Sequence, residues 1–392
     1  MQEKIKPNIL IISPFFPPDK TVASLRMGSL SNYLSKKGYN VAILTNKRTQ
    51  TTENIELSFF YVDASDEKNI SFKKQRLQTK KNKQNYEIAF RNVVSKFSPN
   101  IILISGSPFY NFDLAKTAKE MNIPVILDFR DPWIFDFRGI ENILSTQKIY
   151  HRLHHFKDER NAIKNASAVV MVTEGWCNNY KKIYSPWKDK FYVIENGFDE
   201  EALSKIPDKV TQPNETFTIG VFGKFAYYSK KYTLKLLTAL SDIGTENVKI
   251  LQIGDQESIV EKLMDEKNLD HQFFSSTGFI DYTEGIRKLK QMDAFLIVDN
   301  RMNALGTKIY DYIYVNKPII YIGPKKSQMA KLVGSFQHGY ICETRTEIID
   351  TINTLIQKKP ECLQKEINLN QYSRRRQNEK YEELILKTIE TA

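Results

Sequence analysis

The sequence predicts an α/β protein with two tandem, doubly wound parallel sheets that face a central cleft. Three observations predict this fold class. Short apolar runs alternate with helical stretches, the alternation stops at a polar segment near the middle of the chain, and it then starts again. Short strands that are apolar throughout are typical of parallel sheets covered by helices on both faces. The length of 392 residues also suits two domains.

The first predicted domain spans residues 1–205. Its expected strands lie at 9–12, 41–44, 101–104, 125–129, 168–172 and 192–194. Its expected helices lie at 25–37, 88–97 and 112–121, with another ending over 159–164. Right-handed connections between parallel strands then wind the helices onto both faces of one sheet, as in a Rossmann-like domain.

The second predicted domain spans residues 206–371. It begins with a polar, proline-bearing stretch at 207–215 that is typical of a linker. Strands are expected at 218–222, 248–253, 294–298 and 318–322, and helices at 233–240, 259–266, 283–292 and 308–315. The last segment, residues 372–392, is expected to form a charged helix that packs back on the first domain.

The net charge of +11 predicts anionic partners. Between Lys68 and Lys96 there are nine Lys and Arg residues and a single acid, Glu87. This segment is interpreted either as a solvated basic helix or loop, or as a surface that rests on anionic lipid headgroups. No nucleic-acid-binding motif accompanies the charge, so a nucleic acid partner is not expected.

The cysteines and histidines give no metal-binding pattern. Cys177, Cys342 and Cys362 are scattered and odd in number, which favours reduced thiols in a cytoplasm. His151, His154 and His155 share a helix face, but no carboxylate–histidine motif accompanies them, and a surface role is favoured over a metal site. With no apolar run of roughly 20 residues and no signal-peptide pattern, a cytoplasmic protein is expected, with peripheral contact at the inner face of the cell membrane as a further hypothesis.

The segment 303–322 is the most informative about function. Gly306 and Thr307 precede a predicted helix, whose first backbone N–H groups form an anion site that suits a phosphate. Lys308 adds a positive charge, and Asp311 follows one turn later, where a carboxylate can hold a sugar hydroxyl. The alternative interpretation is a surface loop with an ordinary Lys–Asp pair.

Five segments together carry a family resemblance that covers nearly the whole chain. They are 9–18, 128–133 (Asp-Phe-Arg-Asp-Pro-Trp), 196–199 (Asn-Gly-Phe-Asp), 223–231 and 303–322. In this order and spacing the chain resembles glycosyltransferases of the GT-B fold, specifically the large family 4 of retaining enzymes. The resemblance implies a hexosyltransferase-like enzyme that moves a sugar from a nucleotide-diphosphate sugar to a glycan or lipid-linked acceptor, in bacterial surface polysaccharide biosynthesis.

The resemblance also implies which residues bind the donor. Lys224 and Lys231 match the family's Arg and Lys pair, which neutralises the donor diphosphate. Asp311 stands at the second acid of the family's Glu-x7-Glu pattern, while Asn303 stands at the first, so one carboxylate is missing. The full donor-binding set is Gly223, Lys224, Lys231, Gly306, Thr307, Lys308 and Asp311. Neither a metal nor a cofactor is expected.

The candidate catalytic residues are Asp131 and Arg130 of the first domain and Asn303 of the second. A buried Arg–Asp bridge that fixes the loop is the alternative for Asp131 and Arg130. Ser24, Arg26 and Trp133 are the candidate acceptor-binding residues. Arg26 has an equal alternative as a residue that caps the first loop.

Two other functions stay open. One is a GT-B nucleotide-sugar 2-epimerase, which shares the fold and the donor. The other is a catalytically weak nucleotide-sugar-binding or scaffold protein, suggested by Asn303 and by the absence of glycine from the loop at 14–24. No G-x-G-x-x-G motif is present, so a nicotinamide or flavin dinucleotide is not supported.

Overall fold

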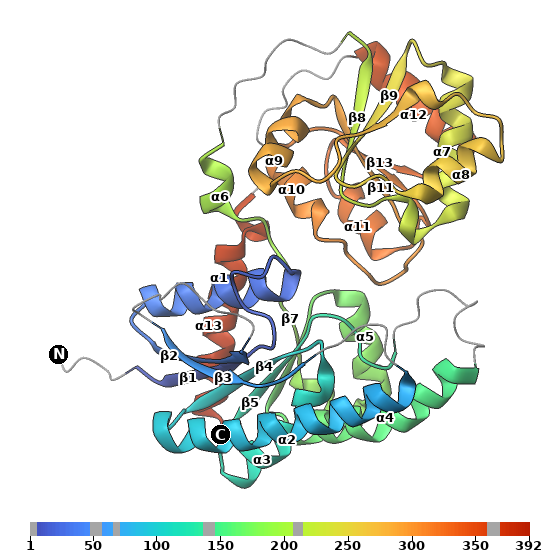
Figure 1. The fold of residues 1–392 in the computed structure, drawn as a ribbon. Coiled ribbons are helices and arrows are strands. Elements are labelled where there is room, and N and C mark those ends of the chain that lie inside the picture. Colours follow the sequence, from blue (N-terminus) through green and yellow to red (C-terminus); the bar gives the residue numbers. More distant parts are fainter. Residues whose placement is uncertain (1–5, 48–56, 66–70, 136–145, 207–214, 359–368) are drawn as a thin grey trace. The chain divides into compact units, whose positions relative to one another are not determined.

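The computed structural model describes residues 6–47, 57–65, 71–135, 146–206, 215–358 and 369–392, with the backbone alone at 72–73 and 146–154. The chain divides into two compact units (Figure 1). The first consists of Met1–Asn196 together with Arg374–Ala392, and the second of Gly197–Ser373. No described helix is both long enough and apolar enough to cross a bilayer.

The first unit contains a seven-stranded sheet in the order β3-β2-β1-β4-β5-β6-β7, and all of its strand pairs are parallel. The strands are β1 (Asn8–Ile12), β2 (Asn40–Asn46), β3 (Ser58–Val62), β4 (Ile101–Ser105), β5 (Val125–Phe129), β6 (Ala168–Met171) and β7 (Phe191–Val193). The strand order reverses between β1 and β4. Every residue of β4 and β5 is buried, and both sequences are apolar except for Ser105 at the end of β4 and Asp128 in β5.

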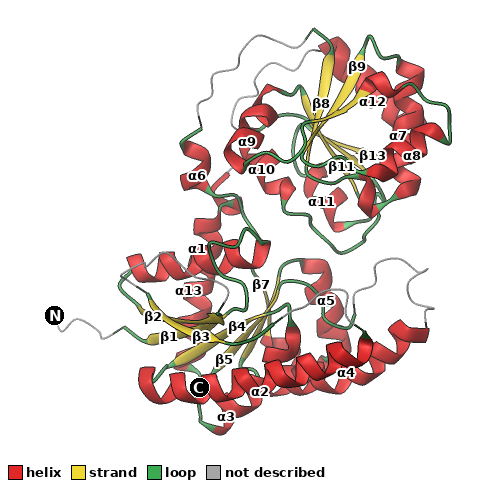
Figure 2. Ribbon diagram, viewed as in Figure 1, coloured by secondary structure: helices red, strands yellow, loops and turns green. Residues whose placement is uncertain are grey.

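Helices cover both faces of this sheet (Figures 1 and 2). One face packs on α1 (Val22–Lys36) and α13 (Arg374–Glu390). The other face packs on α2 (Phe72–Phe97), η1 (Phe109–Asp113), α3 (Leu114–Glu120), α4 (Thr146–Asn165) and α5 (Glu174–Ile183), and η3 (Ser185–Lys190) follows α5. Tyr381, Leu384 and Ile385 of α13 are buried beside Met27 and Leu30 of α1, so the end of the chain completes the core of the first unit.

The second unit repeats the plan with a six-stranded parallel sheet in the order β10-β9-β8-β11-β12-β13. Its strands are β8 (Phe217–Phe222), β9 (Val248–Ile253), β10 (Phe274–Ser276), β11 (Ala294–Val298), β12 (Ile319–Ile322) and β13 (Gly339–Cys342). One face packs on α7 (Lys230–Ile243), α8 (Ser258–Asp265) and α12 (Arg345–Lys358). The other packs on α6 (Glu200–Ser204), α9 (Tyr282–Gln291), α10 (Lys308–Val315) and α11 (Gln328–Gly334).

The predicted fold class of two Rossmann-like sheets, with a C-terminal helix that returns to the first, is confirmed. The structure corrects several details. Strands β3, β10 and β13 and helices α5, α6, α11 and α12 were not predicted. Helix α2 begins at Phe72, sixteen residues before the expected start at 88, because its basic first half still buries Asn82 and Tyr86 against the unit.

The border between the units also differs from the predicted one. It falls after Asn196, so residues 197–205, which were assigned to the first domain, belong to the second unit. Leu203 and Ile206 are buried in the core of that unit, and the Lys290 ammonium donates a hydrogen bond to the carbonyl of Ile206 at 2.8 Å. Residues 372–373 also belong to it, since Ser373 pairs with Phe198.

Candidate functional site

The first part of the candidate site lies where the strand order of the second sheet reverses, between β8 and β11. Ligands of doubly wound sheets bind at the carboxyl ends of the strands at this point. Gly223 and Lys224 follow β8 there. Gly223 has a φ of +68°, and a Cβ at this position would meet nothing within 4 Å. Gly306 is equally open. The space above both glycines is therefore free for a ligand.

Helix α10 begins at this edge of the sheet. Its N-cap residue, Thr307, makes no side-chain capping bond, and the backbone N–H groups of Thr307 and Lys308 have no acceptor among the described residues. The Lys308 ammonium donates to the carbonyl of Lys224. Two free N–H groups and an ammonium at a helix N-terminus form an anion site.

Burial lowers the pKa of Lys308 to about 8. The carboxylates of Glu257 and Asp299 oppose this shift, and the neighbouring Arg301 adds to it. The ammonium is therefore charged at neutral pH but loses its proton more readily than an ordinary lysine.

A buried carboxylate fixes the loop that carries Lys224. Glu257 accepts hydrogen bonds from the backbone N–H groups of Phe225, Ala226 and Tyr227 at 2.6, 3.0 and 2.9 Å. Gln252 Nε2 donates to the carbonyl of Gly223 at 3.1 Å. These bonds hold the loop in a single conformation before any ligand arrives.

Arg301 is a further basic residue at this edge, and it was missed from the sequence. Its Nη2 lies 2.6 Å from Asp299 Oδ2, and its guanidinium carbon lies 4.0 Å from the centre of the Tyr228 ring. Its position in the sequence could have identified it, because Arg301 follows the end of β11, where the strand order of the sheet reverses.

The other predicted donor residues lie on three different segments. Asp311, in the first turn of α10, accepts a hydrogen bond from the Tyr282 hydroxyl at 2.7 Å. Asn303 is half-buried in the loop between β11 and α10. Lys231 is exposed in the first turn of α7, and its ammonium lies 5.9 Å from the centre of the Tyr232 ring. The structure thus brings Lys224 and Lys308 into contact and places Lys231 on the following helix.

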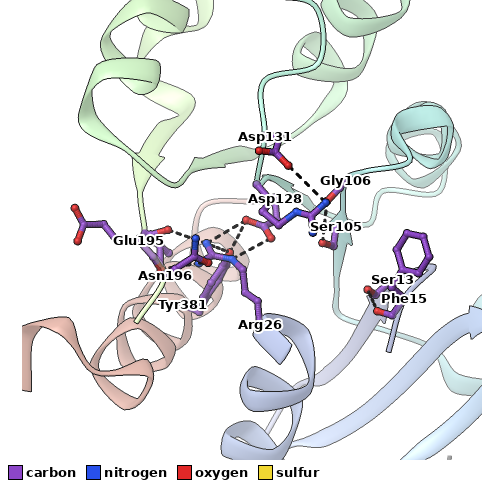
Figure 3. Close-up of polar contacts among 12 residues, drawn as sticks. Ser13, Phe15, Arg26, Ser105, Gly106, Asp128, Asp131, Glu195, Asn196 and Tyr381 are labelled. Atoms are coloured by element: carbon purple, nitrogen blue, oxygen red, sulfur yellow. Dashed lines mark hydrogen bonds and ion pairs between the residues drawn. The ribbon is translucent and has the colours of Figure 1, made fainter. Parts of the chain in front are cut away.

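Figure 3 shows the corresponding edge of the first sheet, where Arg26 of α1 and Asp128 of β5 form a buried ion pair. Arg26 Nε and Nη2 donate to the two oxygens of Asp128, both at 3.2 Å. Nη2 also donates to the carbonyl of Ile194 at 2.7 Å and to the Tyr381 hydroxyl at 2.8 Å. Nη1 donates to the carbonyl of Glu195 at 2.6 Å and to the side chain of Asn196.

This network corrects the predicted acceptor role of Arg26. The side chain is 7% exposed, and all three guanidinium nitrogens donate within the protein, which leaves no free donor for an acceptor. Burial alone would lower the pKa of Arg26, but Asp128 and Tyr381 raise it above its ordinary value. The geometry favours a structural role for Arg26.

Ser24 needs the same correction. It is fully buried, and its hydroxyl donates to the carbonyl of Asp19 at 2.5 Å, while its N–H donates to Thr21 Oγ1, the N-cap of α1. Ser24 therefore stabilises the start of α1 and offers no hydroxyl to an acceptor.

Arg130 and Asp131 follow β5 at the same edge, where Figure 3 labels Asp131. Arg130 Nη2 lies 3.6 Å from Asp131 Oδ2. The side chain of Asp131 is 47% exposed and that of Arg130 is 15% exposed. The Arg130 Nε is buried without a partner among the described residues. The pair is thus open and loosely joined, and the buried Arg–Asp bridge of this region is Arg26–Asp128.

Trp133, the third candidate acceptor residue, packs in an aromatic cluster. Its ring stacks on Phe109, with centroids 5.3 Å apart, and meets Phe112 edge-on. Its backbone N–H donates to the Tyr180 hydroxyl at 3.2 Å. Phe109 covers one ring face, and the His155 ring lies 5.9 Å away at an angle of 35°.

Among the described residues no group of His, Cys, Asp and Glu has the arrangement of a metal site. His155 Nδ1 lies 3.3 Å from Asp158 Oδ2, while the side chains of His151 and His154 fall outside the described residues. Cys177 and Cys342 are buried free thiols.

Comparisons with known proteins agree with the predicted fold. Residues 24–202 match the family model described as Glycosyltransferase Family 4, which confirms the resemblance to family 4 glycosyltransferases. A search of curated proteins found no match.

Solved structures with the same two-sheet, GT-B architecture match the chain along its length. Anabaena Alr3699/HepE in complex with UDP and glucose is 14% identical, with 97% of this chain and 100% of that chain covered and a TM-score of 0.60. WaaG, a glycosyltransferase involved in lipopolysaccharide biosynthesis, is 12% identical over 96% and 95%, also with a TM-score of 0.60. The UDP-GlcNAc 2-epimerase of Methanocaldococcus jannaschii is 12% identical over 97% and 99%, with a TM-score of 0.57. At these identities the likeness shows the fold.

Proposed function

We propose that this protein is a retaining glycosyltransferase that takes a hexose from a nucleotide-diphosphate sugar. The observation that carries the proposal is the anion site at the start of α10, where the free N–H groups of Thr307 and Lys308 lie beside the ammonium of the half-buried Lys308. The family match over residues 24–202 and the UDP and glucose bound in the HepE structure support it.

The donor diphosphate binds over Gly223 and Gly306, between the loop after β8 and the start of α10. As the glycosidic bond breaks, negative charge grows on the departing diphosphate, and Lys308, Lys224 and Arg301 stabilise it. Asp311 and Asn303 hold sugar hydroxyls of the donor. A front-face departure assisted by the diphosphate fits this set of residues. No metal is needed because the cations and the helix N–H groups supply the charge.

The acceptor binds to the first unit, near the open carboxylate of Asp131. Asp131 and Arg130 face the acceptor hydroxyl or the transferring sugar, and Trp133 lies beside them in the wall of the site. The acceptor class we propose is a glycan or lipid-linked glycan of a bacterial surface polysaccharide, made on the cytoplasmic side of the membrane. The lipopolysaccharide role of WaaG supports this class.

A thermal-shift screen with a panel of nucleotide sugars tests the donor site. The true donor raises the melting temperature, because it binds only the folded protein. Lys308→Met and Asp311→Asn are each expected to abolish this shift. Lys249→Met is the matched control, since Lys249 is an exposed residue near the amino end of β9, at the opposite edge of the sheet. Shifts that persist in both site variants would place the donor elsewhere.

The same protein also tests the epimerase alternative, which the fold of the Methanocaldococcus jannaschii enzyme keeps open. Conversion of the donor to its 2-epimer without any acceptor would establish that function. Transfer that requires a membrane-derived acceptor would establish the transferase, and donor binding without either reaction would identify a binding protein.

Helix α2 supports peripheral contact with an anionic membrane. Leu77 and Ile88 are 61% and 70% exposed, and they lie on one face because three helical turns separate them. Lys81 lies on the same face between them, and Lys74 and Lys80 are exposed beside it. Exposed apolar residues among positive charges are typical of a helix that lies in a lipid interface.

Vesicle flotation tests this contact. The triple reversal of Lys74, Lys80 and Lys81 to Glu is expected to lower partition into phosphatidylserine-containing vesicles by at least about 100-fold. The control reverses the same charge at Lys249, Lys262 and Lys267, which are exposed residues of the second unit, and should retain binding. Wild-type protein that stays with the soluble fraction would rule the membrane contact out.

A further inference from the structure

A buried carboxylate lies behind the segment that follows Asp131. Glu159, on α4, is fully buried. Its Oε2 accepts the backbone N–H of Ile134 at 3.0 Å and the Tyr180 hydroxyl at 3.1 Å. Its Oε1 accepts the Tyr184 hydroxyl at 2.6 Å. The Tyr180 hydroxyl in turn accepts the N–H of Trp133. Two consecutive backbone N–H groups are therefore tied, directly or through Tyr180, to one carboxylate.

This arrangement exceeds what the fold requires. An isolated buried carboxylate is costly unless hydrogen bonds satisfy it, and an apolar side chain would fill the same space at lower cost. The carboxylate, on α4, accepts a hydrogen bond from a segment outside any helix or strand. It provides a charged acceptor for backbone N–H groups that have no strand partner, so it fixes the course of the chain just after Arg130 and Asp131.

We propose that Glu159 is a positioning residue whose carboxylate holds the segment from Pro132 to Phe135 and thereby sets the position of Arg130 and Asp131 for sugar transfer. This inference rests on the proposed function, since it assigns Glu159 a part in that reaction. Glu159 acts through the chain and does not touch the substrate. Tyr180 and Tyr184 belong to the same device because they complete the hydrogen bonds of the carboxylate.

The surroundings of Glu159 make this device sensitive to pH. Burial raises the pKa of Glu159 to about 7, against the opposing effect of its hydrogen bonds from Tyr184, Ile134 and Tyr180. The titratable groups in contact with it are the hydroxyls of Tyr180 on α5 and of Tyr184, the C-cap of α5. The segment from Pro132 to Phe135 contributes only a backbone N–H and no titratable side chain, and Arg160 of α4 acts on Tyr184.

The ionised form accepts all three hydrogen bonds, whereas protonation converts one oxygen to a donor. The raised pKa means that this ionised form is present above about pH 7 and is lost as the pH falls below it. Below about pH 7, Glu159 should therefore hold the segment from Pro132 to Phe135 less firmly.

Hydrogen exchange tests the anchor without any substrate. In Glu159→Gln, exchange at the Trp133 and Ile134 amides should accelerate by about 10- to 100-fold, with a smaller effect in Tyr184→Phe. Asp158→Asn is the matched control, because Asp158 neighbours Glu159 on α4 but faces His155. If Glu159→Gln fails to fold, Tyr180→Phe removes the acceptor for Trp133 and leaves the carboxylate in place. Unchanged exchange in these variants would overturn the proposal.

Transfer kinetics then separate positioning from the proposed function. Glu159→Gln should lower kcat by about 10-fold or more with an unchanged KM for the donor. The wild-type rise of kcat through about pH 7 should flatten in the variant. Equal kcat and equal pH profiles in the two proteins would overturn the positioning role while the transferase function stands. A wild-type protein that transfers no sugar would instead overturn the proposed function, and a confirmed anchor would then be purely structural.

Discussion

Replacing Arg26 by alanine is expected to lower the free energy of unfolding of the first unit by about 3–5 kcal/mol. The change leaves Asp128, which is fully buried, as a charge without its cation, and it removes the donors of the Ile194 and Glu195 carbonyls. Breaking a buried ion pair on one side is far more costly than never having formed it.

Urea unfolding followed by tryptophan fluorescence measures this effect in the right unit, because all three tryptophans, Trp133, Trp176 and Trp187, lie in the first unit. Arg91→Ala is the control. Arg91 also pairs with a carboxylate, Glu87, but its side chain is 53% exposed, so a loss of about 0–1 kcal/mol is expected. Equal losses in the two variants would contradict the structural role of Arg26.

Replacing Lys308 by methionine is expected to lower the transfer rate by about 100- to 1000-fold, the typical cost of removing one preorganised electrostatic group from a transition state. The wild-type protein should also lose donor affinity as the pH rises. The pKa of Lys308 is lowered to about 8, so the ammonium that holds the diphosphate is present below that pH and is lost above it.

Calorimetric titration with the donor found in the screen, at pH 7 and at about pH 9.5, measures this dependence. Lys308→Arg is the control, because a guanidinium stays charged throughout this range, and its affinity should change little between the two conditions. A wild-type affinity that is the same at both pH values would show that Lys308 does not bind the diphosphate in its charged form.

Much of the fold could be predicted because its determinants are local. The residues of β4 and β5 are apolar apart from Ser105 and Asp128, since helices cover both faces of the sheet. Strand β3 was missed because this edge strand keeps four of its five residues exposed or half-exposed, and its sequence lacks the uniform apolar run of an inner strand. The early turns of α2 were missed because this part of the helix is rich in lysine and has too few buried residues to show the helical spacing of apolar side chains.

The site could be predicted only in part, for a related reason. The anion-binding part is contiguous from Gly306 to Asp311, so the sequence displays it directly. The Arg26 network includes Arg26 and Tyr381, which are separated by 355 positions in the sequence. No local sequence pattern predicts a contact over such a separation. Glu159 is likewise one acidic residue in a charged helix. Only the fold brings the hydroxyls of Tyr180 and Tyr184 into contact with it.

The return of α13 to the first unit has a consequence for synthesis. A ribosome makes the second unit in full before it makes the residues from Arg374 onward. Until then, Met27 and Leu30 of α1 lack the side chains of Tyr381, Leu384 and Ile385 that cover them in the finished protein, and Arg26 lacks one of its acceptors. The second unit can therefore complete its fold first, while the first unit keeps an apolar face exposed until α13 is synthesised.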